Sequence, residues 1–236
     1  MRAVILAGGK GTRLRPYTYS LPKPLMPIGE EMPILEIILK QLKKNGFNNI
    51  TIAVNYMAKI IQAFFGDGSD WDLNINYSLE KKMLNTIGPL TLIEDLPDNF
   101  LVMNGDILTD LNYKDFFLWH IENENDISVA TYKRDSKINF GVLKYNSDQE
   151  IIEFIEKPEY HFDVSMGIYA LNRRVIKDLP KNEPYGFDEL MINGIKSNLR
   201  VKAYPFDSYW LDIGRDDDYQ KANEDFISNK KKIFSL

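Results

Sequence analysis

The stretch Ala3-Val4-Ile5-Leu6-Ala7-Gly8-Gly9-Lys10-Gly11, near the start of the chain, decides the predicted fold. Ala3 to Ala7 is a short continuous apolar run, as expected of a β-strand that is buried on both faces of a sheet. Three glycines follow it within four residues. Because glycine lets the backbone approach a ligand closely and aim successive N–H groups at it, the stretch predicts a strand ending in a phosphate-binding turn.

Two well-known phosphate loops do not match these residues. The Walker A pattern needs Gly-x4-Gly-Lys followed by Ser or Thr, and no register of the stretch supplies it. The dinucleotide fingerprint needs a third glycine, but Leu14 follows Arg13, and the second predicted strand ends at Asn55 instead of at an acid that could hold a ribose. Both interpretations fail on the residues themselves.

Strand-like and helix-like segments alternate along the chain. The predicted strands are 3–7, 49–54, 73–77, 100–103, 126–131, 140–145, 151–155 and 164–171, and the predicted helices are 33–44, 57–65, 113–122, 188–196 and 217–226. This order predicts an α/β fold: a Rossmann-like, mostly parallel mixed sheet flanked by helices, with a β-rich part in the second half. We expect one domain, 1–236, with two halves of about 1–110 and about 111–236.

Composition narrows the class of protein. The chain has 236 residues, a net charge of −5 and no cysteine, so disulfides, thiolate metal sites and a cysteine nucleophile are excluded. The acidic balance argues against a nucleic-acid partner. No apolar run reaches membrane-spanning length, and the opening run is too short for a signal peptide, so we expect a cytoplasmic protein without a membrane partner. Only two histidines, His120 and His161, are present, which disfavours a zinc site.

A longer pattern surrounds the glycines: Gly8-Gly9-x-Gly-Thr-Arg-Leu-x-Pro16, then Thr18 and Leu21-Pro22-Lys23-Pro24-Leu25. In order and spacing it resembles the opening motif of the sugar-1-phosphate nucleotidyltransferase family, with a motif pattern nearest to mannose-1-phosphate guanylyltransferase-like members. The resemblance runs from Met1 to about Tyr219. It implies an enzyme that joins an NTP to a sugar 1-phosphate and releases pyrophosphate, with a nucleotide-binding half at about 1–110 and a sugar-phosphate-binding half at about 111–236. Whether the protein forms a homo-oligomer is left open.

The resemblance also implies roles for individual residues. Arg13 and Lys23 are expected to be catalytic, because negative charge accumulates around the α-phosphate and must be screened and held in line. The expected nucleotide-binding residues are Leu6, Ala7, Gly8, Gly9, Gly11, Thr12, Arg13, Glu80, Asn85, Gly88 and Asn104.

Two aspartates are the expected metal ligands. Asp106 follows a predicted buried strand in Asn104-Gly105-Asp106, at the edge where open α/β sheets place ligands. Asp212, in Tyr209-Trp210-Leu211-Asp212-Ile213-Gly214, fits the later metal motif of the family. Mg²⁺ typically takes one or two carboxylates together with phosphate and water, so Mg²⁺ is the expected cofactor.

The sugar-phosphate site is expected from three further family motifs. Gly141 lies in a segment whose glycine backbone contacts the sugar in the family, Glu156 and Lys157 form the Glu-Lys-Pro motif, and Gly167 lies in the strand that walls the sugar pocket.

The segment Glu80 to Leu90 departs from the family pattern. This segment contacts the nucleobase in relatives, so the identity of the base is left open. Relatives that use guanine nucleotides have Gly where this chain has Asn85, and Ala where it has Ile87. Asn85 could offer its amide to a base edge or adopt a left-handed turn. Glu80 could accept hydrogen bonds from guanine, which favours GTP by a small margin. The alternatives are a cytidylyl- or uridylyltransferase for another phosphate, or a non-catalytic relative that binds nucleotide sugars.

Overall fold

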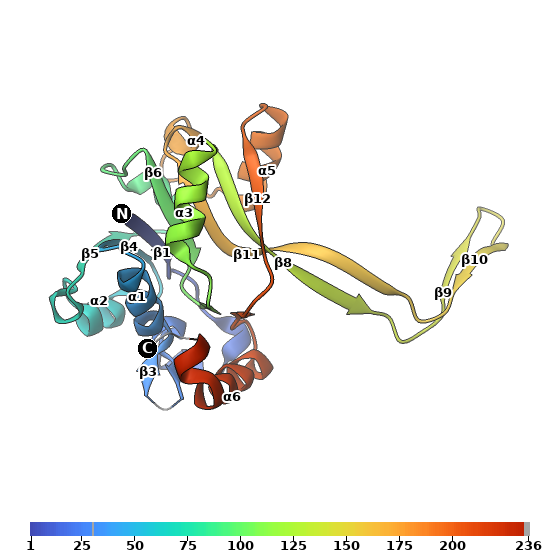
Figure 1. Ribbon diagram of the computed structural model, residues 1–236, viewed down its shortest axis with the longest axis horizontal. Coiled ribbons are helices and arrows are strands. Elements are labelled where there is room, and N and C mark those ends of the chain that lie inside the picture. The colour runs from blue at the N-terminus through green and yellow to red at the C-terminus, as the bar shows by residue number, and fades with distance from the viewer. Residues whose placement is uncertain (30, 234–236) are drawn as a thin grey trace.

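The computed structural model describes residues 1–29 and 31–233, with the side chains of 227 and 229–233 left aside, so the last three residues of the predicted domain lie outside it. Its main element is a seven-stranded sheet with the order β12-β8-β11-β6-β1-β4-β5 (Figure 1). The strands of this sheet are β1 (Arg2–Leu6), β4 (Asn49–Val54), β5 (Asn74–Leu79), β6 (Asn99–Asn104), β8 (Ile127–Lys137), β11 (Glu159–Asn172) and β12 (Val201–Phe206). β1 pairs in parallel with β4 and β6, and β11 runs antiparallel to β6 and β8. The predicted mostly parallel mixed sheet is confirmed.

Alternation along β1 builds a core on each face of the sheet. Ala3 and Ile5 belong to one buried cluster and Val4 to another, because successive strand residues point to opposite faces. The first cluster includes residues of α1 (Ile34–Lys44), α2 (Ala58–Phe65), α3 (Tyr113–Glu122) and α6 (Asp216–Ile233). The second includes residues of α4 (Arg174–Lys177) and α5 (Phe187–Lys196). Helices therefore cover both faces of the sheet, as predicted.

Helix ends follow their local chemistry. Pro33 precedes α1, and Asn45 ends it with its side-chain amide donating to the Gln41 carbonyl oxygen at 2.9 Å. Glu189 caps α5 by accepting the Gly186 N–H at 2.7 Å. The Asp218 carboxylate accepts the backbone N–H groups of the two residues before α6. Acidic side chains commonly stabilise helix N-termini in this way, by accepting backbone N–H groups that have no partner within the helix.

The second half differs from expectation in the length of two strands. β8 and β11 pair from Ile127↔Leu171 out to Lys137↔Glu159, well beyond the predicted 126–131 and 164–171. Only the inner ends of the two strands are buried, and their outer ends carry many charged residues, which do not mark a buried strand. The outer ends leave the body as a two-stranded ribbon (Figure 1).

Short strands complete the fold. β9 (Val142–Tyr145) and β10 (Ile151–Ile155) form the predicted hairpin at the end of the ribbon, and β7 (Ile107–Thr109) pairs with β13 (Trp210–Asp212). β2 (Pro27–Ile28) pairs with β3 (Met32–Pro33). Within 1–29 and 31–233, no helix has both the length and the apolar content needed to cross a membrane.

Candidate active site

The glycine-rich turn after β1 has the backbone that the sequence predicts. Gly11 has φ +59°, in the left-handed region, and the Thr18 hydroxyl donates a 2.8 Å hydrogen bond to its carbonyl oxygen. A Cβ on Gly11 would lie 2.8 Å from Thr18 Cγ2, so the position requires glycine. A Cβ on Gly9 would meet no atom within 4 Å, so that part of the turn is open.

A cavity of about 370 Å³ opens beside this turn; we call it the first cavity. It lies at the carboxyl end of β1 and β6, where open α/β sheets bind ligands. The predicted residues that line it are Leu6, Gly8, Gly9, Gly11, Thr12, Arg13, Lys23, Glu80, Asn85, Asn104 and Asp106. Sequence reasoning did not select Pro24, Met83, Thr86, Pro89, Gly105 and Gly214, most of which are direct neighbours of predicted residues.

Two predicted nucleotide-binding residues do not line the first cavity. Ala7 is 4% exposed, and its N–H donates to the Ala53 carbonyl oxygen at 2.9 Å, which continues the β1–β4 pairing. Gly88 donates its N–H to the Tyr185 carbonyl oxygen, and a Cβ on it would lie 2.5 Å from the Glu183 carbonyl oxygen. Both residues therefore pack against neighbouring segments and do not face the cavity.

Glu80 and Asn85 shape the part of the cavity expected to hold the base. Glu80 is 6% exposed, its Oε2 accepts the Leu84 N–H at 3.2 Å, and burial raises the pKa of this carboxyl. A Cβ on Gly8 would lie 2.6 Å from Glu80 Oε1, so glycine is needed for Glu80 to reach the turn. Asn85 takes the left-handed conformation, φ 61°, and also lines the cavity. Asn85 can therefore adopt the left-handed turn and still offer its side-chain amide to a base in the cavity.

Lys23 forms an ion pair with Asp106 inside the first cavity. Lys23 is 9% exposed, and Pro22 and Pro24 on either side restrict its backbone. Asp106 Oδ2 makes this contact, whereas its Oδ1 is buried and has no hydrogen-bond partner among the described residues. An unpaired buried carboxylate oxygen is costly, so Asp106 is suited to a further cationic partner.

Strand pairing brings Asp212 beside Asp106. β13 pairs with β7 so that Asp212 lies opposite Ile107, and the Ile213 N–H donates to the Asp106 backbone carbonyl at 3.0 Å. Burial and the negative charge of Asp106 raise the pKa of Asp212, while the charges of Lys23 and Arg13 oppose that rise. Asp106 therefore lies close enough to Asp212 for its negative charge to affect the pKa of the Asp212 carboxyl.

The pair fits the expected Mg²⁺. Mg²⁺ binds oxygen ligands and is usually held by one or two carboxylates plus substrate phosphates. The unpaired Oδ1 of Asp106 and the charge repulsion felt by Asp212 would both be relieved by a divalent cation. No cluster of three or more His, Cys, Asp or Glu side chains arranged for a metal occurs in 1–29 and 31–233.

A second cavity, of about 450 Å³, adjoins the first and shares Arg13 and Gly214 with it. Its other lining residues are Tyr132, Arg134, Trp210, Leu211, Asp212, Arg215, Asp218 and Lys221. Arg13 packs at the junction, because a Cβ on Gly214 would lie 3.4 Å from Arg13 Nη1. Arg134 comes from β8, whereas Arg215 directly precedes α6 and Lys221 lies within it. These cations were not predicted, since no local pattern distinguishes them from surface residues.

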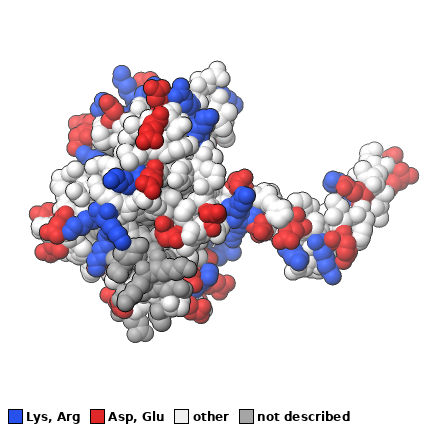
Figure 2. All heavy atoms as spheres, viewed as in Figure 1, with Lys and Arg blue, Asp and Glu red and all other residues white. Residues whose placement is uncertain are grey.

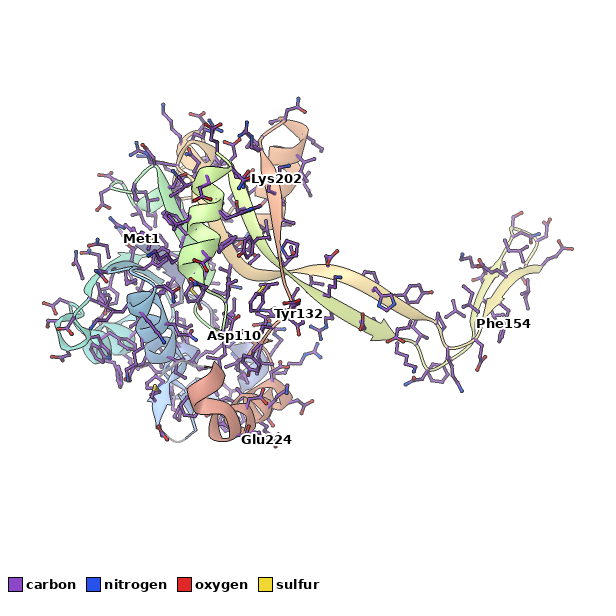
Figure 3. The ribbon with its side chains drawn as sticks, viewed as in Figure 1. Met1, Asp110, Tyr132, Phe154, Lys202 and Glu224 are labelled. Atoms are coloured by element: carbon purple, nitrogen blue, oxygen red, sulfur yellow. The ribbon has the colours of Figure 1, made fainter. Side chains whose placement is uncertain are left out.

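Three predicted sugar-phosphate residues lie at neither cavity. Gly141, Glu156 and Lys157 flank the β9–β10 hairpin on the ribbon that leaves the body (Figure 1). The side chains of Glu156 and Lys157 are each 60% exposed, and their charged ends lie 3.7 Å apart. In Figure 3, Tyr132 marks the root of the ribbon and Phe154 its far end. The long β8–β11 pairing carries these residues away from the pocket.

Gly167, the fourth of these residues, supports the site indirectly. It has φ +73°, and a Cβ on it would lie 2.7 Å from the Asn104 amide nitrogen. Glycine at this position therefore leaves room for Asn104, which lines the first cavity.

The comparisons with known proteins agree with this geometry. A family model described as Nucleotidyl transferase matches residues 2–229. The chain belongs to the nucleotidyl transferase family. The curated relatives of this family member are named as sugar-1-phosphate nucleotidyltransferases, and the resemblance stated from the sequence is confirmed.

Individual relatives differ in base and in length. The chain is 32% identical to D-glycero-alpha-D-manno-heptose 1-phosphate guanylyltransferase of Campylobacter jejuni, covering 93% of this chain and 97% of that protein. It is 31% identical to UTP–glucose-1-phosphate uridylyltransferase of Synechocystis sp., covering 98% of this chain but only 65% of that longer protein. The fold is similar to the crystal structure of HddC from Yersinia pseudotuberculosis, with 28% identity, a TM-score of 0.74 and coverage of 95% and 99%. HddC was also crystallised with GMP-PN.

Proposed function

We propose that this family member condenses an NTP with a sugar 1-phosphate to give an NDP-sugar and pyrophosphate, with Mg²⁺ as cofactor. The observation that carries the proposal is the convergence of Arg13, Lys23, Asp106 and Asp212 where the two cavities meet. One cavity has the glycine-rich turn that suits a triphosphate, and the other has the free space and cations that suit a second phosphate. Two adjoining anion sites match a reaction between two phosphates.

In the proposed reaction, an oxygen of the sugar phosphate attacks the α-phosphorus of the NTP. A new P–O bond forms, the bond between the α-phosphorus and the bridging oxygen breaks, and pyrophosphate leaves with the electron pair. The attacking phosphate is already an anion, so no protein nucleophile is needed. Lys23 and Arg13 stabilise the charge that develops at the α-phosphate, because both are fixed at the site before reaction. Mg²⁺ held by Asp106 and Asp212 would screen the triphosphate charge.

GTP is the proposed nucleotide. Glu80 is buried at the wall of the first cavity, where a carboxylate would accept two hydrogen bonds from the edge of guanine. The guanylyltransferase name of the Campylobacter relative and the GMP-PN complex of HddC point in the same direction. A hexose or heptose 1-phosphate is the proposed acceptor class, since these sugars appear in the names of the curated relatives.

The sugar-phosphate roles of Gly141, Glu156, Lys157 and Gly167 remain proposals taken from the resemblance. Lys157→Ala tests them: a role at the sugar phosphate raises the KM for that substrate and leaves the KM for the NTP unchanged. An unchanged KM for both substrates contradicts the assignment.

The decisive experiment is a matrix of NTPs against sugar 1-phosphates, scored by pyrophosphate release. The proposal predicts release with at least one pair, with GTP the best nucleotide, and no release from an Asp106→Asn variant. Absence of release with every pair, combined with measurable binding of a nucleotide sugar, overturns it. That result supports instead the alternative of a non-catalytic relative, which the altered loop at Asn85 and Ile87 suggests.

A further inference from the structure

The two-stranded extension of the body is an unusual feature of this molecule. We call residues 132–164 the arm: the outer parts of β8 and β11, and the β9–β10 hairpin between them. Figures 1 and 2 show it as a narrow projection that no other part of the body covers. A two-stranded ribbon alone is marginally stable at best in water, so the arm needs something to pack against.

The ribbon part of the arm has two unlike faces. Residues directly opposite each other in an antiparallel pair share a face. One face carries the pairs Lys133↔Asp163, Asp135↔His161 and Lys137↔Glu159, which place opposite charges side by side. The other face carries Arg134↔Phe162 and Ser136↔Tyr160, and the Phe162 and Tyr160 rings stack with centroids 6.4 Å apart. Their aromatic surface is exposed, 53% for Phe162 and 38% for Tyr160.

The hairpin repeats this arrangement. Leu143 lies opposite Phe154 and Tyr145 opposite Ile151, so these four apolar side chains share one face. A register shift between Ile151 and Glu153 inserts an extra residue, which returns Phe154 to the same face as Ile151. All four are 48–69% exposed. Lys144 and Glu153, on the opposite face, form an ion pair of 2.5 Å.

The exposed apolar surface is large enough for a stable interface. The exposed apolar side chains of the arm are Ile138, Phe140, Leu143, Tyr145, Ile151, Ile152, Phe154, Tyr160 and Phe162, which are 37–77% exposed. The strand pairings place all of these except Ile138, Phe140 and Ile152 on the apolar faces described above. At about 150–250 Å² for each large side chain, the whole set exposes roughly 900 Å². A standard protein interface takes about 800 Å² from each partner, so the arm supplies one partner's share.

We infer that the arm is a dimerisation element, in which its apolar face packs against a second copy of this chain. The body cannot cover the arm as it projects, and every copy presents the same face, so self-pairing about a two-fold axis covers both at once. Packing apolar face on apolar face leaves the charge pairs of the opposite face in water, where ions are favoured. The inference does not depend on the proposed reaction.

Sedimentation velocity on the full chain tests the inference. Wild type is expected to sediment as a dimer of twice 27.4 kDa at micromolar concentrations. The double variant Leu143→Lys/Phe154→Lys places two charges on the apolar face and is expected to raise the dimer dissociation constant about a hundredfold or more. The matched control Lys144→Glu/Glu153→Lys exchanges charges on the opposite face of the same strands and is expected to remain dimeric.

A monomeric wild type, or a double variant that dimerises like wild type, overturns the inference. A monomeric wild type would mean that the arm folds back on its own body or binds another protein. Circular dichroism of the double variant checks its folding.

A crosslinking measurement keeps the test valid if that variant does not fold. The chain has no cysteine, so Tyr145→Cys and Ile195→Cys each introduce a single thiol at residues of similar exposure, 69% on the arm and 61% on α5. A bismaleimide is expected to crosslink the first into a dimer and leave the second monomeric. Equal crosslinking contradicts the inference.

Discussion

Replacement of Lys23 by methionine tests the core of the proposed chemistry. Lys23→Met removes the positive charge and keeps a chain of similar length, so the buried stem, only 9% exposed, leaves no large cavity. The change isolates the ammonium group that contacts Asp106 in the first cavity.

The size of the effect follows from electrostatics. One unit charge about 4 Å from another contributes about 4 kcal/mol at an effective dielectric constant near 20. Removal of one group that stabilises a transition-state charge typically lowers kcat about 100- to 1,000-fold, or about 3–4 kcal/mol. The two estimates agree, so we expect kcat to fall by that factor. Stability should fall by only about 1–2 kcal/mol, because the Asp106 side chain is 25% exposed and keeps contact with water.

The assay is pyrophosphate release under saturating substrates and Mg²⁺, with thermal unfolding to confirm the fold. Lys10→Met is the matched control, since Lys10 belongs to the same loop, is exposed and does not line the first cavity. We expect the control to retain wild-type turnover. Wild-type turnover by Lys23→Met would refute the role of this cation in the reaction.

Three further predictions concern the support of the site, the pH dependence of stability and the metal. Gly167→Ala should lower stability by about 1–3 kcal/mol and weaken nucleotide binding, because φ is +73° and the new Cβ would lie 2.7 Å from the Asn104 amide; unchanged melting and binding would contradict this. Burial lowers the pKa of His120 to about 4, so the free energy of unfolding should fall by about 1–3 kcal/mol as pH drops from about 6.5 to about 4, where the unfolded chain binds the proton more readily. Urea titrations of wild type and His120→Gln check this, and an equally steep profile in the variant would be the contrary result. Chelation of Mg²⁺ should abolish pyrophosphate release, and Asp212→Asn should require at least about tenfold more Mg²⁺; turnover in excess EDTA would exclude the metal role.

Local sequence was enough to predict the glycine-rich turn and most strands of the sheet, although not β12. The apolar run from Ala3 to Ala7, followed by glycines, becomes β1 and the wall of the first cavity, because strand burial and left-handed backbone are decided by neighbouring residues. Lys23, which also lines the first cavity, was expected from the resemblance of the contiguous motif Gly8 to Leu25 to the family's opening motif.

Contacts between distant segments required the tertiary structure. Asp106 and Asp212 become neighbours only through the β7–β13 pairing, and Gly167 matters only because it packs against Asn104. In the second cavity, Arg134 of β8 lies with Arg215 and Lys221 from the start of α6, and no local pattern connects these two segments.

The arm shows the same division most clearly. Of the arm, the sequence predicted only the hairpin strands 140–145 and 151–155, because the charged residues of 132–137 and 159–163 do not mark a buried strand. Whether such strands stay on the sheet or leave the body depends on which partner covers the apolar face. That choice is a competition between distant surfaces, so only the tertiary structure showed that the arm carries Lys157 away from the pocket.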